Sequence, residues 1–567
     1  MTSETSNEER EPVSPAGGEN AAAIPRPPAW MPLAGVVSLL AVFAIYLLRL
    51  DRVVGLFTDD AWYVLLAKGL ASGQGYSIVN SPTPGILPLY PPAFPFLLSL
   101  LFRISPDFPD NVWLLKSVSI AAMLGTGVLA YRYFVRDREL PAPWALAIAV
   151  GAVLSPPLVF LATSTVMSES VFALVFLATI VVMERCVRAG SGARGMLLAV
   201  AGAALASAGF LTRSIAFSLV VAGGLYLLKA RLVRSAIVFG AAVAIFAGPW
   251  MIYSRLHAPT PEQQREQGGH IVLPYSTQFW QRRAGFDYLG NVTAAELPGR
   301  VAGNLKEIAG RDIGRIVATP IFEALRDPFA ESRKQNVQEG GRGETLWFSF
   351  ALSLFVVVGL AAALRRKTTM AELAIPLSLG IIALWPWETF RFVLPLIPFV
   401  IFYLMMGVRM LGELHASLRK QAPGRLGNGL ALGVLLAIVA VNLYGNVNYI
   451  RKYAGGDSLD RPQWLQIFDN TEDLLKWTAS QLPADAVIAT NNAPLVHLYT
   501  GRKTISADDP AANWENWERM KVRYMVLIPI YFDPAEAADT KYRVVYRVRA
   551  NPLFRVLDLG EPVAGSR

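Results

Sequence analysis

Long apolar runs recur along most of the chain and are separated by short polar segments. A helix needs about 20 apolar residues to cross a hydrocarbon core about 30 Å thick, and these runs have roughly that length. We therefore predict an all-α polytopic membrane protein with about eleven transmembrane helices. The predicted spans are 31–50, 112–134, 143–162, 166–184, 195–211, 214–229, 235–253, 346–364, 371–386, 390–409 and 427–445.

Basic residues in the short loops predict the orientation, because Lys and Arg accumulate on the cytoplasmic side of a membrane. When the N-terminus is placed in the cytoplasm, every short cytoplasmic loop is basic. These loops are 132–138, 184–194, 229–234, 365–367 and 409–425. The extracytoplasmic face then receives the long loops 51–111 and 254–345, the turn at Arg213 and the segment after residue 445.

The two ends of the chain differ from the membrane domain, which we place at 30–450. Residues 1–29 have almost nothing apolar to bury and predict a disordered cytoplasmic tail. Residues 455–567 combine helical spacing at 471–483 with β-like runs, and they predict a small extracytoplasmic α/β domain. The predicted strands are 485–490, 522–530, 542–548 and 553–559.

Composition supports a membrane protein and removes several classes of function. Hydrophobic residues make up 53% of the chain and charged residues 17%, against about 25% charged in soluble proteins. The net charge of +9 is explained by the orienting loops, so no nucleic acid partner is predicted. The single cysteine, Cys186, excludes an intrachain disulfide and a cysteine metal cluster.

The first predicted outer loop opens with an acidic pair. Asp59 and Asp60 begin a helical stretch that Thr58 can cap, in a first turn where negative charge suits the helix dipole. Apolar residues share one face of this stretch, and its Trp and Tyr predict an interfacial helix at headgroup depth. The helix would hold a carboxylate just above the bilayer, unless both acids serve only to start it. The Pro-rich segment 89–102 is too short to span and is also predicted at the interface.

Further charged residues lie at the predicted outer ends of the spans. A carboxylate at the edge of a span usually faces a cavity, although Glu169 also suits a helix-start acid. Topology gives no reason for Arg213 on this face, which favours a phosphate or carboxylate partner over snorkelling to headgroups. The same reasoning applies to Arg391. Glu388 lies three residues before Arg391 and could instead pair with it. Arg255 follows the seventh span on the same face.

These outer-face residues have no GxGxxG, P-loop, HExxH or GxSxG context, so they predict neither a nucleotide fold nor a hydrolase elbow. His270 in the long outer loop ranks as a surface histidine. No histidine cluster indicates a transition metal. A divalent cation on Asp59, Asp60 or Glu169 stays an open alternative.

The order of these residues along the chain resembles the order of the motifs in the membrane-embedded glycosyltransferases of the C superfamily. This group includes the protein O-mannosyltransferases and the aminoarabinose transferases of lipid A. The superfamily shares a core of seven spans, its first seven. The likeness in this chain covers about residues 31–400. The matching features are Asp59-Asp60 after the first span, Ser168-Glu169 opening the fourth, Thr212-Arg213 at an outer turn, Pro249-Trp250 with Arg255 ending the seventh, and RFVLPLIPF at 391–399. Where aminoarabinose-type enzymes have Lys-Pro, this chain has Tyr90-Pro91-Pro92, and it has no second-loop Asp-x-Asp.

The resemblance implies an inverting glycosyltransferase at the extracytoplasmic face of a bacterial inner membrane. Its donor would be a sugar linked to polyprenyl phosphate, and its acceptor a lipid, a glycan or a protein. Asp59 would act as general base, and Arg213 or Arg391 would stabilise the leaving phosphate. Asp60 and Glu169 would position the sugar, the acceptor or a cation.

Two other classes of function fit parts of the pattern. A transporter or lipid flippase also needs charged residues facing a cavity, but its sites lie near mid-membrane on broken helices. The charged candidates here gather at one surface, which favours an enzyme. A membrane-anchored scaffold, in which the segment after residue 455 binds a partner, would leave Asp59 dispensable.

Overall fold

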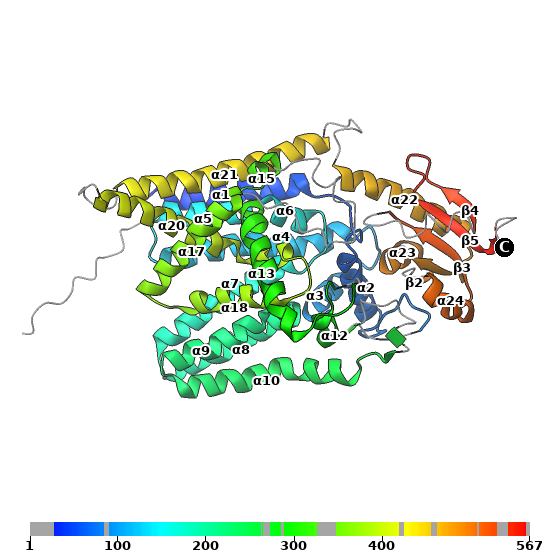
Figure 1. Ribbon diagram of the computed structural model, residues 1–567, viewed down its shortest axis with the longest axis horizontal. Helices are drawn as coiled ribbons and strands as arrows, with labels where there is room; N and C mark the ends of the chain where they lie inside the picture. The colour runs from blue at the N-terminus through cyan, green and yellow to red at the C-terminus, as the bar shows by residue number, and fades with distance from the viewer. Residues whose placement is uncertain are drawn as a thin grey trace, which may run out of the picture.

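A computed structural model shows a bundle of long helices with a small sheet at one end (Figure 1). The predicted tail 1–29, apart from its last two residues, lies outside the described residues, and so does His270. The structure describes residues 28–83, 85, 90–261, 263–264, 273–284, 289–325, 347–418, 425–454, 462–506, 510–529 and 542–562.

Within these ranges, eight helices are long and apolar enough to cross a membrane. They are α1 (Met31–Arg49), α4 (Val112–Arg136), α7 (Glu169–Ala189), α8 (Ala193–Thr212), α10 (Val233–Leu256), α17 (Trp347–Arg366), the run through α19 (Phe390–Val393) and α20 (Ile397–Leu418), and α21 (Arg425–Ala454). A further predicted span is a pair of helices bent by 54°, α5 (Ala142–Val153) and α6 (Pro156–Thr163).

The two remaining predicted spans hold shorter apolar helices, α9 (Phe217–Lys229) and α18 (Met370–Leu384). Every predicted span therefore contains a helix, and the predicted helical membrane architecture is confirmed. The total of about eleven crossings and their orientation stay predictions.

Small residues let the helices of the bundle pack closely. A Cβ atom on Gly359 of α17 would lie 1.8 Å from the carbonyl oxygen of Tyr403 in α20. A Cβ atom on Gly407 of α20 would lie 2.0 Å from the carbonyl oxygen of Phe355. The two backbones thus touch in both directions, as is usual where apolar helices associate in a membrane.

The segment predicted to be the first outer loop forms α2 (Asp59–Ala71) and α3 (Ala93–Phe102), which lie between the bundle and the sheet (Figure 1). The sequence predicted that the aromatic rings of α2 lie among lipid headgroups, and this was wrong. Trp62 is only 3% exposed and Tyr63 only 5%, because α3 and the C-terminal domain enclose α2 in one apolar cluster. The flat placement of α2 at the membrane interface stays a prediction. The other outer loop contributes α12 (Tyr275–Trp280), α13 (Leu297–Glu307), α14 (Ile313–Val317) and α15 (Thr319–Leu325).

The C-terminal domain is the predicted α/β unit. Its sheet, over the described residues, has the order β2-β1-β3-β5-β4, with β1 parallel to β2 and β3, and with β5 antiparallel to β3 and β4. The sequence predicted four of these strands and missed β2, a polar four-residue strand. The elements are α22 (Gln463–Gln481), β1 (Val487–Thr490), α23 (Ala493–Thr500), β2 (Lys503–Ser506), α24 (Pro510–Arg519), β3 (Val522–Leu527), β4 (Tyr542–Arg547) and β5 (Arg555–Pro562).

Candidate active site

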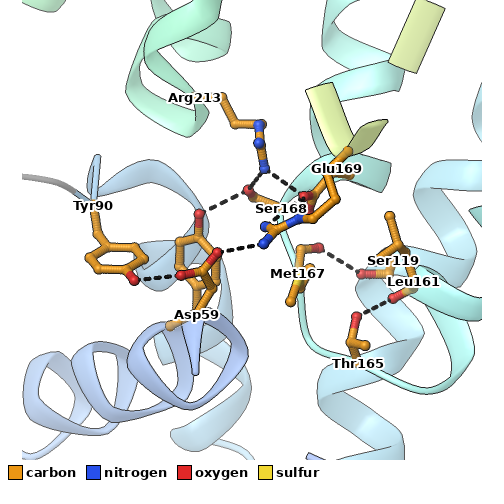
Figure 2. Close-up of polar contacts among 11 residues, drawn as sticks. Asp59, Tyr90, Ser119, Leu161, Thr165, Met167, Ser168, Glu169 and Arg213 are labelled. Atoms are coloured by element: carbon orange, nitrogen blue, oxygen red, sulfur yellow. Dashed lines mark hydrogen bonds and ion pairs between the residues drawn. The ribbon is translucent and has the colours of Figure 1, made fainter. Parts of the chain in front are cut away.

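Charged side chains from four separate segments form one continuous chain of ion pairs (Figure 2). Arg391 Nη1 lies 2.8 Å from Asp59 Oδ2. Its Nη2 and Nε atoms lie 2.9 and 3.0 Å from Glu169 Oε1. Arg213 Nη1 lies 2.9 Å from the same Glu169 oxygen. The structure thus joins Asp59, Arg391, Glu169 and Arg213, which we call the ion chain.

Helix ends place these side chains, and for three of the four the helix dipole also favours the charge. Asp59 is the first residue of α2 and Glu169 the first of α7, where the positive end of the helix dipole attracts a carboxylate. Arg213 follows the last residue of α8 in an extended conformation, at the negative end of that helix. Arg391 is the second residue of the short helix α19. The ion chain therefore gathers four helix termini at one end of the bundle.

Exposure changes along the ion chain. The side chain of Glu169 is fully buried and that of Arg213 is 9% exposed. Asp59 and Arg391 are 32% and 37% exposed. The outer half of the ion chain is thus open to a ligand, whereas the inner half is enclosed by protein.

Hydroxyl groups complete the site, and one acceptor atom is left over. Tyr90 donates to Asp59 Oδ1 at 2.7 Å, and burial raises its pKa well above the ordinary value, so this hydroxyl keeps its proton. Arg213 Nη1 donates to Ser168 Oγ at 3.1 Å (Figure 2). Glu169 Oε2 is buried without a hydrogen-bond partner. Most buried polar atoms have a hydrogen-bond partner, so this oxygen is an exception within the enclosed half of the ion chain.

Asp60 turns away from the ion chain and holds the backbone that precedes α2. Its carboxylate accepts N–H bonds from Gly55 at 2.7 Å, and from Phe57 and Ala61 at 3.1 Å each. Burial raises the pKa of Asp60 to about 6. Thr58, expected to cap the helix, makes no side-chain capping bond and has φ 60° and ψ −57°. The Asp60 carboxylate thus supports the backbone before α2 and takes no part in the ion chain.

The other predicted site residues lie apart from the ion chain. Glu388 is 69% exposed and contacts Arg283 at 3.4 Å, so it does not pair with Arg391. Arg255 is exposed near the end of α10 and joins none of these ion pairs. In the described part of the chain no three His, Cys, Asp or Glu residues gather as metal ligands. Asp59 and Glu169, left open as ligands of a divalent cation, each contact a guanidinium group.

Asp312 supports the site from a distant position in the chain and was not identified from the sequence. The hydroxyl of Thr389 donates to the buried Asp312 Oδ2, and Arg311 Nε donates to its Oδ1 at 2.8 Å. Asp312 ends a π-helical turn between α10 and α17, a distortion often found at functional sites. This contact fixes the chain two residues before Arg391. It joins positions 77 residues apart, which no local motif reveals.

Comparison with known proteins finds likeness in structure alone. No family model and no curated protein matches the sequence. ArnT from Cupriavidus metallidurans, bound to undecaprenyl phosphate, has a TM-score of 0.56 at 12% identity, over 94% of this chain and 98% of ArnT. Its apo state has a TM-score of 0.52 at 14% identity, over 93% and 98%. The oligosaccharyltransferase of Archaeoglobus fulgidus, tethered with an acceptor peptide, has a TM-score of 0.50 at 12% identity, over 92% and 74%.

The chain shares its fold with ArnT and with the archaeal oligosaccharyltransferase. The resemblance drawn from short motifs is thereby confirmed at the level of the fold. Within this shared fold, the ion chain lies where the ends of α7, α8 and α19 meet α2.

Proposed function

We propose that this protein is an inverting glycosyltransferase that moves a sugar from a polyprenyl-phosphate donor to an acceptor at the extracytoplasmic face of the membrane. The half-open ion chain is the observation that carries the proposal, because it places a reachable carboxylate beside a reachable guanidinium. The C-superfamily fold supports it, since ArnT with this fold binds undecaprenyl phosphate. The sugar is a hexose or a pentose, and the acceptor is a lipid, a glycan or a protein.

Asp59 is the general base in this proposal. Its exposed carboxylate has one oxygen on Tyr90 and one on Arg391, so an acceptor hydroxyl can replace either bond. The hydroxyl gives its proton to Asp59 and attacks the anomeric carbon. The bond from that carbon to the phosphate oxygen breaks on the opposite face, its electron pair leaves with the lipid phosphate, and the configuration inverts. A well-placed general base contributes about 10²–10⁴-fold to the rate.

Arg391 receives the leaving phosphate. The four members of the ion chain balance to zero charge, so a donor phosphate adds a negative charge that the more exposed arginine can meet. Turning toward the phosphate would draw Arg391 from Asp59 and free the base once a donor is bound. Arg213 keeps Glu169 in place, and Glu169 in turn orients Arg391 toward the open half of the ion chain.

The proposal is tested with purified protein, membranes as acceptor and a panel of radiolabelled polyprenyl-phosphate sugars. Wild type should transfer label from at least one donor, and Asp59→Asn should lose about 10²–10⁴-fold of the rate. Glu388→Gln is the matched control, because it neutralises an exposed outer acid outside the ion chain and should keep the wild-type rate. Absence of transfer and hydrolysis with every donor, or full activity of folded Asp59→Asn, would overturn the proposal. Donor movement across vesicles without transfer would favour a flippase.

A further inference from the structure

The C-terminal domain contacts the chain segment that leads into the ion chain. The side-chain amide Nδ2 of Asn492 donates to the carbonyl oxygen of Gly55 at 2.8 Å, across 437 positions of sequence. The N–H of the same glycine donates to Asp60 Oδ2 at 2.7 Å. Two hydrogen bonds therefore link the sheet domain to the first turn of α2, which also carries Asp59.

The amide of Asn492 is held in one orientation. It is 2% exposed, and its Oδ1 accepts from the N–H of Leu495 at 3.4 Å, which caps the start of α23. The amide nitrogen is thereby turned to Gly55. Gly55 has φ +96°, and a Cβ atom there would lie 2.5 Å from Leu495 Cδ1. Only glycine permits this close contact between loop and helix.

A second contact lies beyond the other end of α2. The N–H of Thr504 in β2 donates to the carbonyl oxygen of Asn80 at 2.9 Å, and Asn80 Nδ2 donates back to Thr504 Oγ1 at 3.1 Å. Lys503 Nζ donates to the carbonyl oxygen of Val79 at 2.9 Å. The domain thus holds the chain on both sides of α2.

Thr58 lies between Gly55 and the Asp59 carboxylate, and its backbone conformation is unfavourable. Thr58 has φ 60° and ψ −57°, outside the regions that a β-branched residue readily adopts. Such a conformation persists only where the surroundings enforce it. Asp60 and Gly55 supply local restraints, and Asn492 anchors them to the C-terminal domain.

We propose that Asn492 is a positioning residue that sets Asp59 in the ion chain through Gly55 and Asp60, which makes the C-terminal domain a working part of the active site. The inference rests on the proposed function for its effect on rate. We expect the domain to affect the chemical step rather than donor binding, because Arg391, which meets the phosphate in the proposed function, lies on another helix, α19.

Two substitutions test the contact without removing the cap of α23. Asn492→Asp keeps the capping oxygen and places a second oxygen against the Gly55 carbonyl. Asn492→Ser keeps a capping hydroxyl that is too short to reach Gly55. Both should lower kcat about 10–100-fold with the donor KM unchanged, because small misplacements of reacting groups have effects of this size. Hydrogen exchange in peptides over residues 53–66 should quicken in both, a readout that needs no substrate.

Asn491→Asp is the matched control. Asn491 Nδ2 donates to the carbonyl oxygen of Ile528 at 2.6 Å inside the domain, so this change should lower the melting temperature and keep kcat. Unchanged exchange and unchanged kcat in both Asn492 variants would overturn the inference while leaving an active wild type and the proposed function intact. A wild type inactive on every donor would overturn the proposed function, and the exchange rates would still decide whether Asn492 holds α2.

Discussion

Glu169 is the carboxylate shared by both arginines, so neutralising it tests the whole ion chain. The Glu169→Gln substitution keeps the shape of the side chain and removes its charge. Glu169 Oε1 now receives N–H groups from Arg213 at 2.9 Å and from Arg391 at 2.9 and 3.0 Å. After the substitution, two guanidinium groups would face each other without the anion between them.

The magnitude follows from the burial of each partner. Opposite charges about 4 Å apart attract by about 4 kcal/mol at an effective dielectric constant near 20. Arg213 is 9% exposed and keeps most of this interaction, whereas Arg391 is 37% exposed and its pairing is worth about 0–1 kcal/mol. Breaking a buried pair typically costs about 3–5 kcal/mol, and we expect a loss of stability in this range. Loss of the oriented charges should lower kcat/KM about 10²–10³-fold.

A double-mutant cycle separates the ion pair from other effects. Unfolding in detergent and kcat/KM are measured for wild type, Glu169→Gln, Arg213→Gln and the double variant. The double variant should be no less stable than Glu169→Gln, because the arginine left without its anion is gone, and the coupling should exceed about 1.5 kcal/mol. Additive effects, with coupling below about 0.5 kcal/mol, would refute the reasoning.

Burial raises the pKa of Asp60 from 3.8 to about 6, so the folded state holds this proton more tightly than the unfolded state does. Its contribution to stability should therefore fall as pH rises from about 4 to 6, seen as a pH-dependent difference between the unfolding free energies of wild type and Asp60→Asn. Thr389→Ala should lower kcat about tenfold by freeing the start of α19, whereas Thr389→Ser, which keeps the bond to Asp312, should not. Lys116→Met should destabilise the protein by about 3–5 kcal/mol, measured by detergent unfolding, because Asp51 would lose a fully buried partner at 2.9 Å.

The sequence was a good guide to features that depend on local pattern. Apolar length predicted the spans, since a membrane requires about 20 apolar residues for each crossing. An unexplained charge on the predicted outer face singled out Arg213 and Arg391, and both lie in the ion chain. Glu169 begins α7 as expected, because a helix-start acid leaves a local signal.

The sequence did not predict the features that depend on contacts between distant positions or on where a helix begins. A pair between Glu388 and Arg391 at helical spacing was an open alternative, but α19 begins at Phe390, so that spacing does not apply. The rings of α2 looked suited to lipid headgroups because nothing local shows that the C-terminal domain covers them. Asp312 and Asn492 reach their partners across 77 and 437 positions, and a single sequence carries no sign of such pairings.

The most direct test of the reaction is a single turnover. A polyprenyl-phosphate sugar accepted by the enzyme is mixed with excess protein and acceptor, and free polyprenyl phosphate is measured over time. Wild type should release one lipid phosphate for each sugar transferred, with inverted configuration at the anomeric carbon, and folded Asp59→Asn should be slower by about 10²–10⁴-fold. Equal release by Asp59→Asn, or a product that retains the donor configuration, would contradict direct displacement assisted by Asp59.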